Sequence, residues 1–167
     1  SFQSRPIRFG LGMAATFVIG SLCFGQATDV LHIERNFFGV IRVSRSTDPP
    51  AHVMSHGSTN HGMQRLDPAE RLRAIGYYHP GGPLGQVFAT LGNPDRAKEI
   101  GIIGLGIGGI TSYARAGQRV VYYEIDPAVE RLARNPEYFT YLKDCQAEID
   151  VVLGDARLTI GAEPDSR

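Results

Sequence analysis

One stretch, residues 99–127, constrains the fold of this chain more than any other. An apolar run at residues 100–103 leads into a glycine-rich segment, then a short helix-compatible segment, then a second apolar run ending on Glu124. Glycine lets the backbone turn sharply and approach a ligand closely, because it has no side chain. A helix after such a turn directs unpaired N–H groups at the ligand. The stretch therefore predicts a strand, a tight turn, a helix and a second strand.

The same stretch contains candidate ligand-binding residues. A carboxylate at the tip of the second strand can accept hydrogen bonds from two ribose hydroxyls, which gives Glu124 a role in binding. The backbone beneath the sugar would come from Gly104, Gly106 and Gly108. The pattern predicts a site for a nucleoside-containing ligand. A glycine-rich turn in an α/β domain without a ligand is the alternative, and the strands on both sides make it the weaker one.

Composition limits the partners of the chain. Its 167 residues suffice for one domain of ordinary size. The formal net charge is zero, which argues against a nucleic-acid partner. The two cysteines lie far apart and the histidines show no metal-ligand spacing, so we expect no metal and a reducing, cytoplasmic setting.

The N-terminal region, residues 1–33, is interpreted as an apolar leader. Residues 9–28 carry no charge and are numerous enough to cross a bilayer. Glycines and hydroxyl residues make the run only weakly apolar, so two origins stay open. It is either the end of a membrane segment, which would tether a longer parent protein, or a buried pair of strands.

Residues 34–75 are predicted to form a small antiparallel β domain. Residues 37–44 and 51–58 alternate as strands do, and a turn sequence separates them. Asp67 followed by proline predicts a helix start within residues 67–75.

Residues 76–167 are predicted to form the first half of a Rossmann-like domain. Residues 83–91 place apolar side chains on one helical face, and Asp126 before Pro127 predicts a capped helix. A third strand of parallel type is expected at residues 148–156. The fold class is therefore α/β, with a small antiparallel β domain before a C-terminally truncated parallel sheet. An unpaired sheet edge would remain, so we expect a fragment of a longer protein and a homo-oligomer.

Read in order, these segments resemble the polyamine aminopropyltransferases, the spermidine synthase family. The resemblance covers residues 34–158 and rests on the β unit, Gln64, and the segments YYHPGGPLG, GIIGLGIGG, YYEIDP and GDAR. It implies a methyltransferase-like Rossmann fold and transfer of an aminopropyl group from decarboxylated S-adenosylmethionine to a diamine. Such a transfer needs an unprotonated amine and aligned reactants. The run at residues 9–28 resembles variants fused behind membrane helices.

The resemblance also implies a role for individual residues. Glu124 would bind the ribose, and Asp155 and Ala156 would bind the adenine. The turn under the nucleoside would be formed by Gly104, Gly106 and Gly108. Gln64 would contact the donor's tail, and Tyr78 and His79 would line the amine pocket. Structural alternatives stay open for three of them: Asp155 as a helix cap, Gln64 as a loop residue and His79 as a turn residue before proline.

Two departures from the family pattern shape the functional expectation. An aspartate that grips the donor's terminal amine is replaced by Ile107, and the proton-accepting aspartate of the family follows a fourth strand that is absent here. We therefore expect no aminopropyl transfer by this chain alone. A methyltransferase that uses S-adenosylmethionine, a nicotinamide-dependent dehydrogenase, and a non-catalytic nucleoside- or polyamine-binding domain remain as alternatives.

Overall fold

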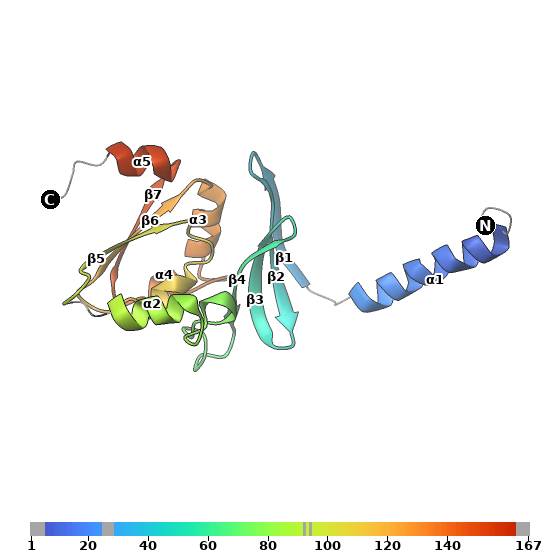
Figure 1. The fold of residues 1–167 in the computed structure, drawn as a ribbon, viewed down its shortest axis with the longest axis horizontal. Coiled ribbons are helices and arrows are strands. Elements are labelled where there is room, and N and C mark those ends of the chain that lie inside the picture. Colours follow the sequence, from blue (N-terminus) through green and yellow to red (C-terminus); the bar gives the residue numbers. More distant parts are fainter. Residues whose placement is uncertain (1–5, 25–28, 92, 94, 163–167) are drawn as a thin grey trace.

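The computed structural model describes residues 6–24, 29–91, 93 and 95–162. Within these residues the chain forms a four-stranded antiparallel sheet followed by a three-stranded parallel sheet with helices (Figure 1). The predicted α/β class, with a β unit before part of a Rossmann-like sheet, is confirmed. The elements in chain order are α1 (Pro6–Phe24), β1 (Asp29–Asn36), β2 (Gly39–Thr47), β3 (Pro50–His56), β4 (Thr59–Arg65), the 3₁₀ helix η2 (Gly76–Tyr78), α2 (Pro83–Leu91), β5 (Glu99–Ile103), the 3₁₀ helix η3 (Gly109–Tyr113), β6 (Arg119–Glu124), α3 (Pro127–Arg134), α4 (Tyr141–Asp144), β7 (Glu148–Leu153) and α5 (Ala156–Ala162).

The antiparallel sheet has the strand order β1-β2-β3-β4, so each strand pairs with its neighbour in sequence. Strands β2 and β3 correspond to the two predicted strands. Strands β1 and β4 were not predicted as strands, because β1 contains four ionisable residues and β4 a glycine and several polar residues. Pairing with β2 and β3 gives both segments the hydrogen bonds that their own composition does not favour.

The predicted helix at residues 67–75 is wrong. The structure has single turns here, in which Glu70 N donates to Asp67 O and Arg73 N donates to Glu70 O. Asp67 does accept a hydrogen bond from Ala69 N, as a cap would. A helix nucleus is costly and so short a segment gains few further bonds, so the turn does not propagate.

The parallel sheet has the strand order β5-β6-β7. Helices α2 and α3 begin at the predicted residues, and Asp126 caps α3 by accepting a hydrogen bond from Ala128 N at 2.9 Å. Residues 104–108, between β5 and η3, form the glycine turn. The helix expected after this turn is only the 3₁₀ helix η3. Hydroxyls of Thr111 and Ser112 donate to backbone oxygens three residues earlier, which competes with regular α-helical bonding.

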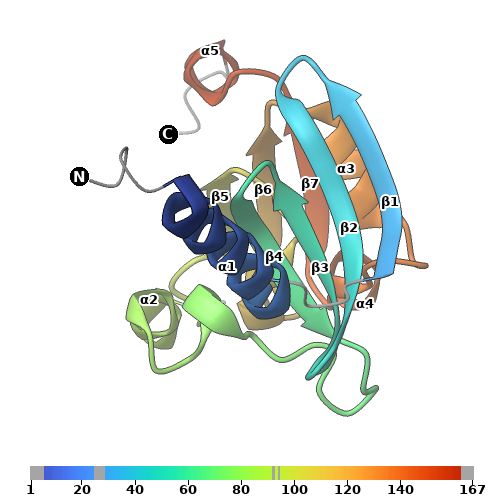
Figure 2. The same ribbon diagram turned by 90° about the vertical axis from the view of Figure 1, so that its right-hand side faces the viewer.

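The two sheets share one hydrophobic core. Ile41, Val43 and Met54 of the antiparallel sheet are fully buried in the same cluster as Leu105 and Ile107 of the glycine turn. Figure 1 shows the antiparallel sheet between α1 and the parallel unit, and Figure 2 shows β1–β4 lying across the face of that unit. The glycine turn is therefore part of the contact between the sheets.

Helix α1 extends away from the two sheets (Figure 1). It exposes large apolar side chains, with Ile7 78% and Phe17 69% exposed. The helix covers most of the uncharged run at residues 9–28, of which residues 25–28 lie outside the described residues. No helix in the described part of the chain is both long and apolar enough to span a bilayer.

Candidate functional site

The glycine turn follows β5, and its backbone adopts a conformation that favours glycine. Gly104, Gly106 and Gly108 have φ angles of +86°, +55° and +77°. A Cβ atom on Gly106 would lie 2.9 Å from the backbone oxygen of His61, and one on Gly108 would lie 2.6 Å from Leu142 Cδ2. A Cβ atom on Gly104 would meet no atom within 4 Å. The turn is sharp as predicted, but close packing inside the protein explains two of its three glycines with positive φ.

The carboxylate of Glu124 points toward this turn from the end of β6. The side chain is buried, Oε2 accepts a hydrogen bond from Leu105 N at 2.8 Å, and Oε1 accepts one from Asp126 N at 2.9 Å. Glu124 thus links the turn after β5 to the turn after β6. Each carboxylate oxygen can accept two hydrogen bonds, so the group retains capacity for further donors.

Asp155 and Ala156 follow the end of β7, beside Glu124. Gly154 N donates to the backbone oxygen of Glu124 at 2.8 Å, which brings the two strand ends together. Oδ1 of Asp155 accepts from Arg157 N and Arg157 Nε, both at 3.0 Å. The hydrogen bonds from Arg157, its side chain first, lower the pKa of Asp155 to about 2. Asp155 therefore has the contacts of a cap for α5, and its adenine contact stays a prediction.

Gln64 is buried near the end of β4, where its side chain contacts two other segments. Its Nε2 donates to Arg71 O at 2.9 Å and to Thr140 Oγ1 at 3.1 Å, while its Oε1 accepts from Thr140 N at 2.8 Å. Both amide hydrogens are thus used within the protein. Contact with a donor's tail stays a prediction, and these bonds give Gln64 a structural role.

Tyr78 and His79 lie at the end of η2 and just after it. A Cβ atom on Gly109 would lie 3.2 Å from Cδ2 of Tyr78, so this ring lies against the residue that follows the glycine turn. Burial raises the pKa of Tyr78 above its ordinary value. His79 is exposed, and its Nδ1 accepts a hydrogen bond from Gly81 N at 3.0 Å. The structure brings Tyr78 to the glycine turn, whereas His79 stabilises a local turn.

Ile107 is a buried contact between the two sheets. Its side chain is 1% exposed, and a Cβ atom on Gly62 of β4 would lie 2.7 Å from Ile107 Cγ1. The position at which the family pattern has an acid is therefore filled by apolar packing.

A pair of histidines near this turn was not identified from the sequence. The rings of His56 and His61 lie 5.5 Å apart, centroid to centroid. Burial lowers the pKa of His61 below its ordinary value of 6.5 and His56 lowers it further, whereas Glu124 and Asp126 raise it. The turn between residues 56 and 61 could have indicated a hairpin with these residues close together. Within the described residues, no group of three or more histidine, cysteine, aspartate or glutamate side chains could hold a metal ion.

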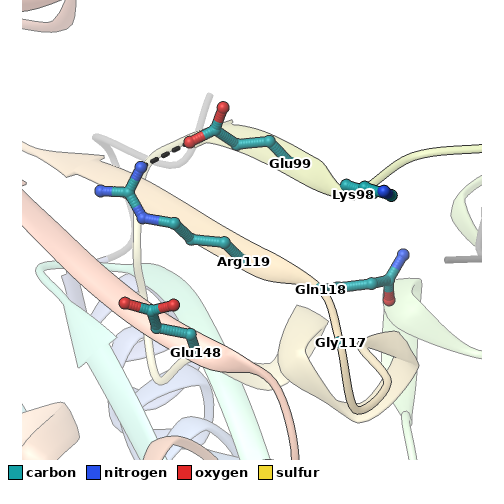
Figure 3. A pocket seen from close by; sticks show the side chains of 6 residues that line it. All are labelled: Lys98, Glu99, Gly117, Gln118, Arg119 and Glu148. Carbon is teal, nitrogen blue, oxygen red and sulfur yellow. Dashed lines mark hydrogen bonds and ion pairs between the residues drawn. The ribbon is translucent and has the colours of Figure 1, made fainter.

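A charged cavity lies elsewhere, at the amino ends of the parallel strands. Its volume is about 420 Å³ and it is lined by Lys98, Glu99, Gly117, Gln118, Arg119 and Glu148 (Figure 3). Arg119 pairs there with Glu99 at 2.5 Å and with Asp150 at 2.6 Å. Open α/β sheets bind ligands at the carboxyl ends of their strands, so we assign this cavity to a surface ion-pair network.

Comparisons with known proteins support the fold. No family model and no curated protein matches this sequence. The structure is similar to spermidine synthase from Thermotoga maritima, with a TM-score of 0.52 and 15% sequence identity, over 79% of this chain and 43% of that chain. The chain thus spans less than half the length of that protein.

Two further solved structures match less well. One is spermidine synthase in complex with the transition-state analogue AdoDATO, with a TM-score of 0.45 and 16% identity, over 75% of this chain and 41% of that one. The other is fibrillarin from Aeropyrum pernix with S-adenosyl-L-methionine, with a TM-score of 0.35 and 18% identity, over 80% and 60%. The similarity to the Thermotoga maritima protein shows that this chain has the fold of part of a spermidine synthase. That part comprises the N-terminal β sheet and the first part of the Rossmann-like unit.

Proposed function

We propose that this chain is the nucleoside-binding part of a spermidine synthase-like protein. Its ligand is decarboxylated S-adenosylmethionine or a related nucleoside, used for aminopropyl transfer to a diamine. The observation that supports this most directly is the Glu124 carboxylate, which faces the glycine turn at the carboxyl end of the parallel sheet. The similarity in fold to spermidine synthase adds support.

The chemistry of a ribose fits this carboxylate. The hydrogen bonds from Leu105 N and Asp126 N hold both oxygens of Glu124 in place before any ligand arrives. A ribose diol offers two hydroxyl donors, and the remaining lone pairs of the two oxygens can accept them. Because the group is preorganised, binding pays little for ordering it.

Ile107 supports a second candidate, a methyltransferase that uses S-adenosylmethionine. An ammonium group buried against an isoleucine would lose its hydration without a compensating partner, at a cost of several kcal/mol. The methionine carboxylate of S-adenosylmethionine does not require an acid at residue 107. The proposed nucleoside site is the same for both candidates.

The test is isothermal titration calorimetry of the chain with decarboxylated S-adenosylmethionine, S-adenosylmethionine, 5′-methylthioadenosine and NAD. We expect the adenosyl sulfur compounds to bind and NAD to bind more weakly. Tighter binding of S-adenosylmethionine than of its decarboxylated form would favour the methyltransferase. Binding of none of the adenosyl compounds would overturn the proposal.

The matched variants are Glu124→Gln and Glu148→Gln. Glu148 lies at the amino end of the same sheet, away from the proposed site, so its variant should bind as the wild type does. Glu124→Gln should bind at least about tenfold more weakly, because an amide nitrogen replaces one acceptor. Circular dichroism of both variants separates loss of binding from loss of fold.

A further inference from the structure

Tyr77 lies beside the glycine turn and is held there by two contacts. Its hydroxyl donates a hydrogen bond to the backbone oxygen of His61 at 3.2 Å, and a Cβ atom on Gly106 would lie 2.9 Å from that same oxygen. The rings of Tyr77 and Tyr78 lie 4.2 Å apart, centroid to centroid. A Cβ atom on Gly109 would in turn lie 3.2 Å from Cδ2 of Tyr78. Both neighbours of the Tyr77 side chain therefore pack directly on the turn.

The segment that carries Tyr77 is itself fixed to the parallel unit. The backbone oxygen of Tyr78 accepts a hydrogen bond from the hydroxyl of Tyr113, at the end of η3. The ring of Tyr113 stacks on Phe88 of α2, with the centroids 4.9 Å apart. These contacts join η2 to η3 and α2, so the ring of Tyr77 has a defined position.

The ring of Tyr77 nevertheless remains open to solvent, with 59% of the residue exposed. An exposed tyrosine alone implies no function, but this one is ordered and stands beside the candidate ligand site. The face of an aromatic ring is partly negative and attracts cations within about 6 Å of its centroid. Because the ring is already held in place, contact with a ligand costs little further ordering.

The proposed ligands carry a positive charge close to this ring. In S-adenosylmethionine and in its decarboxylated form, the sulfonium sulfur is bonded to C5′ of the ribose. With the ribose at Glu124, which accepts from Leu105 N, this sulfur would lie near the next residue of the turn, Gly106. The turn itself, GLGIG at residues 104–108, contains no acidic side chain. An aromatic face is a means of stabilising a sulfonium without one.

We propose that the ring of Tyr77 forms a cation–π contact with the sulfonium group, so that the site selects a sulfonium nucleoside over an uncharged one. This inference rests on the proposed function, since the sulfonium reaches Tyr77 only when the ribose is bound at Glu124. It applies equally to both candidate ligands, because both are sulfonium compounds. It gives a binding role to a tyrosine that the sequence pattern did not single out.

The experiment is calorimetry of the whole chain with a matched pair of nucleosides. One is the S-methylated sulfonium form of 5′-methylthioadenosine, and the other is its carbon isostere, in which CH replaces the charged sulfur. The wild type should bind the sulfonium at least about threefold more tightly than the isostere. Tyr77→Leu should lose this preference and bind the isostere as the wild type does. Tyr77→Phe, which keeps the ring and loses only the hydroxyl, should retain the preference.

A tryptophan at residue 77 gives a second readout. The chain contains no tryptophan, so Tyr77→Trp introduces a single indole fluorophore. Tryptophan forms the strongest cation–π contacts of the aromatic side chains. The variant should therefore prefer the sulfonium at least as strongly as the wild type does, and the sulfonium should change its fluorescence more than the isostere.

The outcomes separate this inference from the proposed function. Equal affinity of the wild type for the two nucleosides, or a preference that survives Tyr77→Leu, would overturn the role of Tyr77 while nucleoside binding stands. An equal loss of both nucleosides in Tyr77→Leu would also overturn it, because the ring would then act by packing rather than by charge. If neither nucleoside nor 5′-methylthioadenosine binds to the wild type, the proposed function fails and this inference fails with it.

Discussion

Ile107 and Gly62 form a contact in which a side chain of the glycine turn lies directly on the backbone of β4. The contact leaves no room for a methyl group on Gly62, whose φ of +148° also disfavours other residues. The position of the antiparallel sheet and the shape of the glycine turn therefore both depend on Gly62 and Ile107. The identity of residue 107 therefore affects how the two sheets pack against each other.

Gly62→Ala should destabilise the chain by about 1–3 kcal/mol, because the new methyl group overlaps Ile107 and the backbone becomes strained. Gly57→Ala is the matched control: its φ of +57° imposes strain, but a Cβ atom there meets nothing within 4 Å. Urea denaturation should show a larger loss for Gly62→Ala. Equal losses would show that the contact between the sheets is not tight.

Asp155 and Arg157 give the chain a specific response to acid. The folded pKa of Asp155, about 2, lies below its ordinary value of 3.8. The stabilisation from this pair is therefore present above pH 3.8 and is lost as the pH falls toward 2. NMR titration of Arg157→Gln should show the pKa of Asp155 rising toward 3.8, and an unchanged pKa would contradict the pairing.

At the scale of the elements, Asp126 connects the parallel unit to the antiparallel sheet. Besides capping α3, its two carboxylate oxygens accept hydrogen bonds from Asn36 Nδ2 of β1 at 2.8 and 2.7 Å. Asn36 in turn accepts hydrogen bonds from Phe38 N and Gly39 N in the turn between β1 and β2. A single aspartate thus fixes both a helix start and the position of a hairpin.

A double-mutant cycle of Asp126→Ala and Asn36→Ala measures this connection. Each variant should lose about 1–3 kcal/mol of stability. Asn36→Ala removes two hydrogen bonds from the buried Asp126 carboxylate, and Asp126→Ala removes both the cap of α3 and the acceptor of the half-buried Asn36 amide. The coupling free energy between them should be about 1 kcal/mol or more. Additive losses would mean that the hydrogen bonds across the two sheets contribute nothing.

The elements that could be predicted are those fixed by local sequence. The glycine turn, the cap at Asp126 and strands β5, β6 and β7 follow from short-range patterns. The partners of Gln64 could not be predicted, because Thr140 is 76 residues away. The β-bulge that leaves His61 without a partner residue in β3 arises only when β3 and β4 pair. Contacts between residues far apart in the sequence therefore determine the features of the candidate site that the sequence pattern did not predict.

At the scale of the whole molecule, strand β5 forms an edge of the parallel sheet beside an apolar cavity. The cavity, about 420 Å³, lies between this strand and α2, and its lining includes Leu84, Val87, Phe88 and Ile102. Unpaired strand edges and exposed apolar surface favour association with another chain. The expected homo-oligomer stays a prediction, and this is the surface at which we place it.

Analytical ultracentrifugation of wild type and Val87→Lys tests that prediction. Val87 is 49% exposed, so a lysine there should weaken self-association without unfolding the chain. Leu158→Lys, at a residue 72% exposed on α5, is the control and should associate as the wild type does. A chain that remains monomeric at all concentrations, or equal association of both variants, would contradict the prediction.

The most direct test of the proposed ribose site compares two ligands on the unaltered chain. Calorimetry with 5′-methylthioadenosine and with its 2′-deoxy analogue changes one ribose hydroxyl and leaves the hydrogen bonds of Glu124 to Leu105 and Asp126 intact. We predict that the deoxy analogue binds at least about tenfold more weakly, a loss of about 1.4 kcal/mol. Equal affinity for the two ligands would contradict the assignment of Glu124 to the ribose.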